Sequence, residues 1–248
     1  KMVAHFKKKK TQIFFVLQNR FNDPILKLKK AISKGLFGDL LMFTVRLRWS
    51  RDIKYYTQAK WRGTWKLDGG VVANQSAHFM DLLQWIFGMP DSVFSRIRQM
   101  HKIKSVEDTA LAIFEYKKEK KIALIEATTA IRPKNLEGSI SVIGSKGSAV
   151  IGGMSADKII SWSLNNKRDN DLNNVKNIKR YELSHNKFYN YVISVLNKKI
   201  KKNSLSGEEG IKSLKLINAV YSSSQKNTPV DLKDIKDTFL GNDIKGLL

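Results

Sequence analysis

Three polar side chains recur at helical spacing in an otherwise apolar stretch, "NQSAHFMDLLQW", at residues 74–85. A helix turns by about 100° per residue, so Asn74, His78 and Asp81 would share one narrow face while apolar residues fill the other directions. An imidazole can move a proton near neutral pH, and an amide or carboxylate beside it can orient it or bind a substrate. The spacing therefore predicts an acid–base site on this face. A structural histidine whose ring is held by Asp81 fits the same spacing.

Metal binding is a weaker interpretation of the same histidine. The remaining histidines, His5, His101 and His185, lie in unrelated segments and lack the spacing of metal ligands. The chain has no cysteine, which excludes disulfides and thiolate metal sites and fits a reducing compartment. We therefore expect no metal site and a cytoplasmic location.

The composition bounds the partners of the chain. Of its 248 residues, 42% are hydrophobic and 27% are charged, which is ordinary for a globular protein. No apolar run reaches the roughly 20 residues that cross a bilayer, so we expect no membrane partner. The net charge is +23, but the lysines are scattered and form no stripe with interleaved aromatic residues. We therefore expect no nucleic-acid partner.

Two kinds of element should position the polar helix. Residues 2–10 are typical of a helix end, and the nearly all-apolar residues 11–17 are typical of a strand buried on both faces. Pro24 and Gly35 bracket a further helix. From residue 39 onward, alternating segments joined by turn residues predict strands, and two helices follow them. The predicted strands span residues 39–51, 108–116, 121–130, 138–145, 147–153 and 157–164, and the predicted helices span 185–199 and 207–225, the last with Ser206 as N-cap.

This order of elements predicts an α+β fold: a large, mainly antiparallel, open-faced sheet with helices on one side, preceded by the last helix and strand of a truncated Rossmann domain. The two helices after the strands are too few to cover both faces of about six strands. The uncovered face would carry alternate apolar residues of segments such as "LAIFEY" and "IALIEATTA". A soluble monomer rarely exposes such a face, so we expect a homodimer or homotetramer, built on two-fold symmetry, that buries it.

Five motifs, taken together and in order, resemble those of one enzyme family. They are "QNRFNDPI" (18–25), "WSRDIKYY" (49–56), "WRGTWKLDGG" (61–70), "NQSAHFMDLLQWIFGMP" (74–90) and "SGEEGIKSLKLINAVYSSS" (206–224). The family that they resemble is the glucose–fructose oxidoreductase, inositol dehydrogenase and MocA family of NAD(P)-dependent sugar oxidoreductases. Within it, they look most like the UDP-N-acetylglucosaminuronate 3-dehydrogenase branch of bacterial surface-polysaccharide biosynthesis. The resemblance implies an oxidoreductase that oxidises a nucleotide-activated sugar.

The resemblance also implies roles for the polar face. His78 matches the histidine that handles the proton of the sugar hydroxyl in this family, whereas Asn74 stands where many members have an aspartate. An amide cannot supply the negative charge that raises the pKa of an imidazole, so Asn74 would hydrogen-bond the substrate or the ring. We expect His78 and Asn74 to be catalytic, and Gln75 and Asp81 to lie in the substrate pocket.

Two further groups of residues are expected to bind substrate. Gln18, Arg20 and Asn22 would lie at the end of the predicted buried strand, where open α/β sheets bind their ligands. Arg51 and Tyr55 follow another strand and are suited to a phosphate or carboxylate. Capping of the strand end and ordinary surface pairing are the alternative roles for these residues.

Two features of the family are missing from the sequence. No G-x-G turn for dinucleotide phosphates occurs, and no proline follows a lysine, so the family's Glu-Lys-Pro motif is missing too. We therefore expect residues 1–35 to be the remnant of an N-terminal dinucleotide-binding domain with its connecting helix, and residues 36–248 to be the substrate-binding and oligomerisation domain. NAD or NADP would bind to the absent domain and not to this fragment, which would be inert alone. A pseudoenzyme or assembly module that retains the sheet without chemistry is the alternative.

Overall fold

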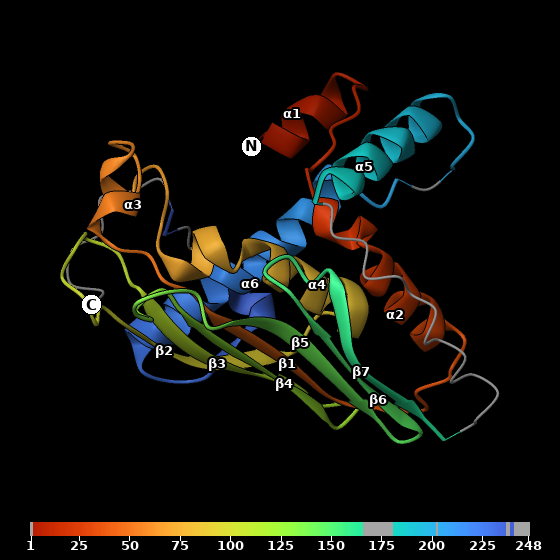
Figure 1. Ribbon diagram of the computed structural model, residues 1–248. Coiled ribbons are helices and arrows are strands. Elements are labelled where there is room, and N and C mark those ends of the chain that lie inside the picture. Colours follow the sequence, from red (N-terminus) through yellow and green to blue (C-terminus); the bar gives the residue numbers. More distant parts are fainter. Residues whose placement is uncertain (1, 166–180, 202, 237–238, 241–248) are drawn as a thin grey trace.

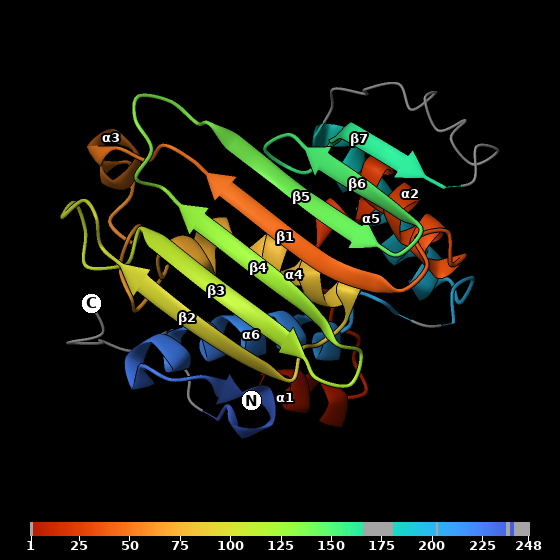
Figure 2. The same ribbon diagram turned by 90° about the horizontal axis from the view of Figure 1, so that it is seen from below.

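A computed structural model describes residues 2–165, 181–201, 203–236 and 239–240 of the chain. One eight-stranded sheet runs through the molecule, with helices on one face of it (Figure 1). Figure 2, seen from below, shows the opposite face without covering helices. The predicted α+β fold, with helices on one side of a mainly antiparallel sheet, is confirmed.

The strands of the sheet are β1 (Leu40–Arg48), β2 (Ser92–Arg98), β3 (Thr109–Tyr116), β4 (Lys121–Thr128), β5 (Glu137–Gly144), β6 (Gly147–Gly152), β7 (Lys158–Leu164) and β8 (Val230–Asp231). Their order across the sheet is β7-β6-β5-β1-β4-β3-β2-β8. β1 and β4 run parallel, and the other neighbouring pairs run antiparallel. The first strand in the chain therefore lies in the middle of the sheet, flanked by the hairpins β3–β4 and β5–β6.

The helical elements are α1 (Met2–Lys8), η1 (Gln18–Phe21), α2 (Asp23–Ser33), α3 (Ile53–Thr57), the π-helical turn η2 (Val71–Gln75), α4 (Ala77–Phe87), α5 (Tyr181–Leu196), α6 (Gly207–Lys226) and η5 (Leu232–Asp234). Helices α4 and α6 pack on the sheet (Figure 1). α3 lies at one end of the molecule, and α1, α2 and α5 lie at the other (Figure 1). The helices thus form a layer over one sheet face with a lobe at each end.

Alternation along the strands decides which side chains enter the core. On β3, Ala110 and Phe114 are buried, whereas Leu111 and Ile113 between them are 51% and 47% exposed. Burial of a large apolar side chain stabilises the fold by on the order of 2 kcal/mol. A slip of one residue in strand register would exchange the two faces, so the packed face fixes the register.

A row of serines near the end of α6 completes the sheet edge. The last strand, β8, pairs with β2 only at Ser92 and Val93. Beyond them, the backbone N–H groups of Ser95 and Ile97 donate to the side-chain hydroxyls of serines 223 and 224, each at 3.1 Å. An unpaired edge N–H is costly when buried, so the short "SSS" run of α6 takes the place of strand partners.

Residues 11–17 form no strand, which corrects the prediction for this segment. Its apolar side chains pack against helices instead: Leu17 belongs to a small second core with Phe188 and Leu205. The N–H of Phe15 donates to the carbonyl of Leu205 at 2.8 Å. An apolar run indicates burial, but it does not show whether a sheet or helices provide the burial.

Two further elements differ from the prediction. Strand β2, "SVFSRIR", was missed because its serines and arginines hide the alternation of its apolar residues. The stretch at residues 74–85 is not one helix, since it begins within the π-helical turn and continues as α4. Among the described helices, none combines the length and apolar character that a membrane crossing requires.

The open face of the sheet carries apolar and charged side chains together. Phe94, Ile113 and Ile122 lie on it and are 36–47% exposed. At the end of β1, Arg48 donates to the carboxylates of two neighbouring strands, to Glu126 at 2.6 Å and to Glu137 at 3.1 Å. The face is therefore apolar over β2, β3 and β4, with an ion-pair cluster beside it.

Candidate functional site

The π-helical turn and the start of α4 carry the polar residues that the sequence indicated. The side-chain amide of Asn74 donates to the carboxylate of Asp68, and that of Gln75 donates to the hydroxyl of Tyr55 at 3.2 Å. His78 follows as the second residue of α4. Two oriented amides thus precede the imidazole by one helical turn.

The imidazole of His78 is in the state required of a base. Its Nε2 lies 3.2 Å from the side-chain amide nitrogen of Gln18. An amide nitrogen only donates hydrogen bonds, so this contact places the imidazole proton on Nδ1. Burial lowers the pKa of His78, nearby Asp81 raises it, and His185 lowers it further. The net lowering keeps the ring neutral near pH 7 and able to accept a proton.

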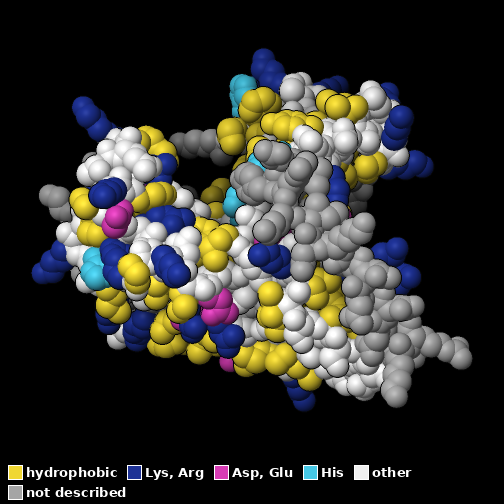
Figure 3. Space-filling model, in the orientation of Figure 1, with side chains coloured by type: hydrophobic (Ala, Val, Ile, Leu, Met, Phe, Trp, Pro, Cys, Tyr) yellow, Lys and Arg dark blue, Asp and Glu magenta, His cyan; other side chains and the backbone are white. Residues whose placement is uncertain are grey.

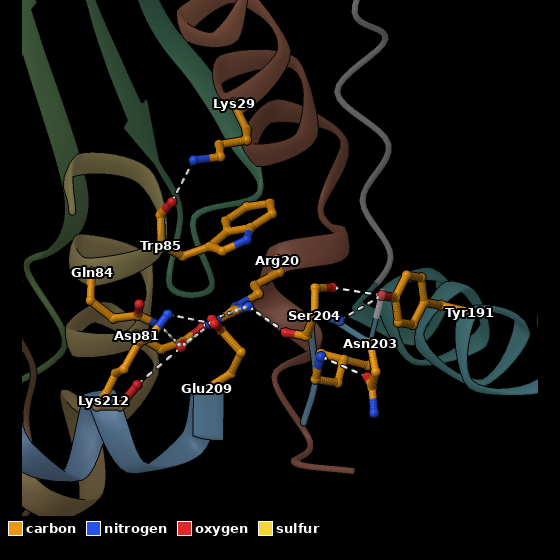
Figure 4. Close-up of polar contacts among 12 residues, drawn as sticks. Arg20, Lys29, Asp81, Gln84, Trp85, Tyr191, Asn203, Ser204, Glu209 and Lys212 are labelled. Carbon is orange, nitrogen blue, oxygen red and sulfur yellow. Dashed lines mark hydrogen bonds and ion pairs between the residues drawn. The ribbon is translucent and has the colours of Figure 1, made fainter. Parts of the chain in front are cut away.

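Behind His78, Arg20 and Asp81 form a buried ion pair (Figure 4). The Nε of Arg20 donates to Oδ2 of Asp81 at 2.7 Å, and its Nη2 donates to Oδ1 at 2.6 Å. Both side chains are only 2% exposed. Arg20 also donates to the carbonyl of Ser204 at 2.7 Å and approaches Glu209 at 3.4 Å. The guanidinium thereby joins η1, α4 and the N-terminal end of α6.

The carboxylate of Asp81 is bonded beyond the ion pair. Its Oδ1 accepts from the amide of Gln84 and from the hydroxyl of Ser213, both at 3.0 Å. The ring of Trp85 lies 5.1 Å from the guanidinium carbon of Arg20 (Figure 4). A buried ion pair stabilises a fold only when its hydrogen bonds are satisfied, which is the case here. This network fixes α4, and therefore His78, relative to its neighbours.

Two arginines beside α3 stack on aromatic rings. The guanidinium carbon of Arg51 lies 5.0 Å from the ring centres of both Trp49 and Tyr55. That of Arg62 lies 4.1 Å from the ring of Tyr55 and 5.1 Å from that of Trp61. In the part of the chain that the structure describes, neither arginine has a carboxylate within 4 Å. The charge of Arg62 acts on the nearby carboxyl of Asp68, whose pKa burial raises and this charge lowers. Two cations beside one aromatic ring still favour an anionic ligand.

The surface above these elements is hollowed. Figure 3 shows a depression between the lobe that carries α3 and the lobe that carries α1 and α5, with apolar and histidine side chains at its floor. The described residues contain no group of three or more histidine, aspartate or glutamate side chains that could hold a metal ion. A neutral base, oriented amides and two guanidinium groups beside an aromatic ring together suit proton transfer on a polar, anionic molecule.

A protein-family model described as "Oxidoreductase family, C-terminal alpha/beta domain" matches residues 29–232. The chain belongs to this family. No curated protein sequence matches the chain significantly.

Solved structures of dehydrogenases share the fold of this family member. The WlbA dehydrogenase from Bordetella pertussis, solved with NADH and UDP-GlcNAcA, is 32% identical, with 93% of this chain and 66% of that chain covered and a TM-score of 0.81. The WlbA dehydrogenase from Chromobacterium violaceum, solved with the same ligands, is 33% identical over 93% and 65% of the two chains, with a TM-score of 0.82. A levoglucosan dehydrogenase at 16% identity and a TM-score of 0.74 shows the fold alone.

These similarities confirm the resemblance to the oxidoreductase family and to its UDP-N-acetylglucosaminuronate branch. The chain spans about two thirds of the length of the WlbA structures that it matches.

The structure of this oxidoreductase-family chain brings predicted site residues into contact around the π-helical turn and the start of α4. Gln18 contacts His78, and Tyr55 contacts Gln75. Asn74 lies in the same turn as Gln75, but its amide is held by an aspartate. The roles of these side chains toward a substrate stay predictions.

Other predicted residues have protein partners that account for their polarity. Arg20 and Asp81 bind each other in the buried network. The amide of Asn22 donates to the carbonyl of Ser155 at 2.5 Å, which ties the start of α2 to the loop after β6. Arg51 donates to the carbonyl of its neighbour Ser50 at 2.8 Å, and its buried Nε has no hydrogen-bond partner among the described residues. Substrate binding by these residues also stays a prediction, and their contacts favour a supporting role for all but Arg51.

Sequence reasoning missed three residues of this region. Asp68 and Arg62 lie in "WRGTWKLDGG", a segment in which the sequence analysis assigned no role to the charged residues. Glu107 lies two residues before β3, and only the fold brings it into contact with the π-helical turn. The sequence alone shows only that Glu107 is an acidic residue next to a predicted strand.

Proposed function

We propose that this protein takes part in the NAD-dependent oxidation of a nucleotide-activated sugar of the UDP-GlcNAcA type. The observation that carries the proposal is the neutral imidazole of His78, held by Gln18 next to the amides of Asn74 and Gln75. Its chemical context comes from the WlbA dehydrogenases solved with NADH and UDP-GlcNAcA, which are 32% and 33% identical to this chain.

In this proposal His78 removes the proton of a sugar hydroxyl. The amide of Gln18 marks the position at Nε2 that the hydroxyl would take. Asn74, oriented by Asp68, leaves its amide oxygen available to the sugar. A bound nicotinamide cofactor supplies the hydride acceptor. These residues supply the base and the sugar contacts but no G-x-G turn, so we assign the binding of the cofactor to none of them.

We assign the anionic groups of the substrate to the arginine pair beside α3. Arg51 and Arg62 both stack on Tyr55, whose hydroxyl contacts Gln75 in the π-helical turn. Guanidinium groups bind phosphate and carboxylate oxygens through paired hydrogen bonds. A diphosphate or a uronate carboxylate placed there would leave the sugar within reach of the turn.

His78→Ala in the protein that the gene encodes tests the reaction. Loss of a proton-transfer group should lower turnover of UDP-GlcNAcA with NAD by about 10²–10⁴-fold, followed as NADH formation, with little change in thermal stability. The matched control is His101→Ala, since that ring is exposed and lies 3.1 Å from the carbonyl oxygen of Ala130. Unchanged turnover in His78→Ala would contradict the assigned base.

A pseudoenzyme or assembly module is the second candidate. It is favoured by Asn74 in place of an aspartate and by the missing Glu-Lys-Pro motif. Binding of UDP-GlcNAcA to the protein that the gene encodes, without any NADH formation, would support this candidate over the enzyme. NADH formation that depends on His78 would eliminate it.

We also propose that residues 1–35 form the connecting part of a dinucleotide-binding domain and that residues 36–248 form the substrate-binding and oligomerisation domain. The exposed apolar residues of β2, β3 and β4 support burial of the open face in a homodimer or homotetramer of at least about 1,000 Å² of interface. Surface-polysaccharide biosynthesis in the cytoplasm is the proposed context, because UDP-GlcNAcA is an activated sugar.

Light scattering at micromolar concentration tests the oligomer. Ile113→Asp, which places a charge in the middle of the open face, should dissociate it. Leu67→Asp is the control, because Leu67 is 67% exposed and lies outside the sheet. A monomeric wild-type protein would contradict the proposal.

A further inference from the structure

Glu107 is a buried carboxyl that the proposed reaction does not use. It is 0% exposed and lies beneath the π-helical turn. Its Oε1 accepts from the N–H of Val72 at 3.0 Å and from the hydroxyl of Tyr221 at 2.8 Å. Its backbone carbonyl accepts from the N–H of Val71 at 3.1 Å. Three hydrogen bonds therefore join this one residue to the turn and to α6.

These bonds supply the N-terminal cap that the turn lacks in its own sequence. The first N–H groups of a helical turn have no acceptor within it, and a side chain at the N-cap usually accepts from one of them. The N-cap residue here is Gly70, which has no side chain. Glu107 takes over this role from a distant part of the chain, since it accepts from the first two N–H groups of the turn, those of Val71 and Val72.

Gly70 makes room for this cap, and Gly69 allows the backbone to turn before it. A Cβ on Gly70 would lie 2.1 Å from the carbonyl oxygen of Glu107 and 2.2 Å from its Oε2. Gly69 adopts a φ of +77°, and a Cβ there would lie 2.6 Å from the Cβ of Ala73. The close approach of Glu107 thus explains Gly70, whereas the positive φ and the contact with Ala73 explain Gly69.

The capped turn carries the two amides of the candidate site. Asn74 and Gln75 are its fourth and fifth residues, and His78 follows in α4. α4 is fixed separately by the ion pair of Arg20 and Asp81. Movement of the turn would therefore displace the amides relative to the imidazole, and a misplacement of about 1 Å can cost an enzyme about 10² in rate.

We infer that Glu107 is a positioning residue, which holds Asn74 and Gln75 in register with His78 by capping the π-helical turn from below together with Tyr221. The placement of the two amides follows from the contacts alone. Its effect on sugar oxidation rests on the proposed function.

Side-chain amide resonances of Asn74 and Gln75 test the placement without any substrate. Glu107→Ala removes the bonds to Val72 and Tyr221 and should shift both amide resonances, whereas Glu107→Gln keeps an acceptor oxygen and should restore them in large part. Glu119→Ala, at an exposed glutamate, is the matched control and should leave them in place. If Glu107→Ala does not fold, Tyr221→Phe removes one of the same bonds and should shift the resonances less.

The kinetic arm uses the protein that the gene encodes. Glu107→Ala should lower kcat/KM for UDP-GlcNAcA at least about tenfold, mainly through kcat, and Glu107→Gln should recover most of it. Resonances that move no more than in Glu119→Ala, or an unchanged kcat/KM in an active protein, would overturn the inference. If the resonances shift as expected but the wild-type protein does not oxidise the sugar, the positioning role stands and the proposed function is wrong.

Discussion

Two buried acids lie behind the candidate site, and the protein satisfies them in different ways. Asp81 faces the guanidinium of Arg20 in a bidentate pair. Glu107 has no cation within 4 Å among the described residues, and the N–H of Val72 and the hydroxyl of Tyr221 both donate to the same oxygen. Its other oxygen, Oε2, has no hydrogen-bond partner in the described part of the chain.

The two acids therefore differ in what surrounds the carboxyl group. Burial raises the pKa of Glu107 to about 7, the bonds from Val72 and Tyr221 oppose this rise, and the charge of Asp108 adds to it. Asp81 faces a permanent cation, the guanidinium of Arg20. One half of the site, α4, is held by an ion pair, while the other half, the π-helical turn, is held by a carboxyl that is close to losing its charge.

Replacement of each acid by its amide should give the largest difference between them in the free energy of unfolding. Asp81→Asn leaves the buried Arg20 without a counter-charge and should lower the free energy of unfolding by about 3–5 kcal/mol. Glu107→Gln at pH 5 replaces an acid that is already protonated and should cost no more than about 1–2 kcal/mol. Urea unfolding at pH 5 measures both, with the exposed Asp234→Asn as a control that should change little. Equal losses at the two acids would refute the distinction between them.

The pH dependence of stability should come next in size. A carboxyl whose pKa rises from 4.5 to about 7 on folding binds its proton more tightly in the folded state. Its contribution to stability is fully present below pH 4.5 and is lost as the pH rises through about 7, which amounts to up to about 3 kcal/mol. The lowered pKa of His78 acts in the opposite direction, since its burial penalises protonation at low pH.

The difference between wild type and Glu107→Gln isolates the carboxyl. Unfolding free energies measured at pH 5 and at pH 8 should fall with pH by up to about 3 kcal/mol more in the wild type than in the variant, because His78 contributes equally to both. Parallel pH profiles would show that Glu107 stays ionised in the folded protein and would contradict its raised pKa.

The sequence predicted the sheet well because its strands have one packed face and one open face. The alternation on β3 and β4 directly records which residues are buried. It failed at residues 11–17, where all-apolar side chains pack on helices and leave no period to read. It missed β2 because serines and arginines interrupt the apolar alternation of that strand, and because its outer edge is completed in part by serines of α6, which lie far away in the sequence.

The site was only partly predictable, because many of its contacts join residues that lie far apart in the sequence. Local spacing found Asn74, His78 and Asp81 because they lie within a few residues of one another. The ion pair of Asp81 joins it to a residue 61 positions away, and the cap of the turn comes from a residue 35 positions beyond it. Such contacts depend on the fold, so the sequence identified polar residues without showing which of them support others.

The smallest expected effect tests the link between Tyr221 and Glu107. Tyr221→Phe removes one donor to Oε1, while the N–H of Val72 still donates to it, so no buried acceptor is left bare. The free energy of unfolding should fall by about 1 kcal/mol.

The phenol hydroxyl lowers the pKa of Glu107, so its removal should also move the pH-dependent loss of stability to higher pH. Tyr116→Phe is the matched control, because its hydroxyl donates to the carbonyl of Gly88 at 2.9 Å, away from both acids. It should cost a similar free energy without moving the pH profile. A profile that shifts equally in both variants, or in neither, would show that Tyr221 does not act on the carboxyl that caps the turn.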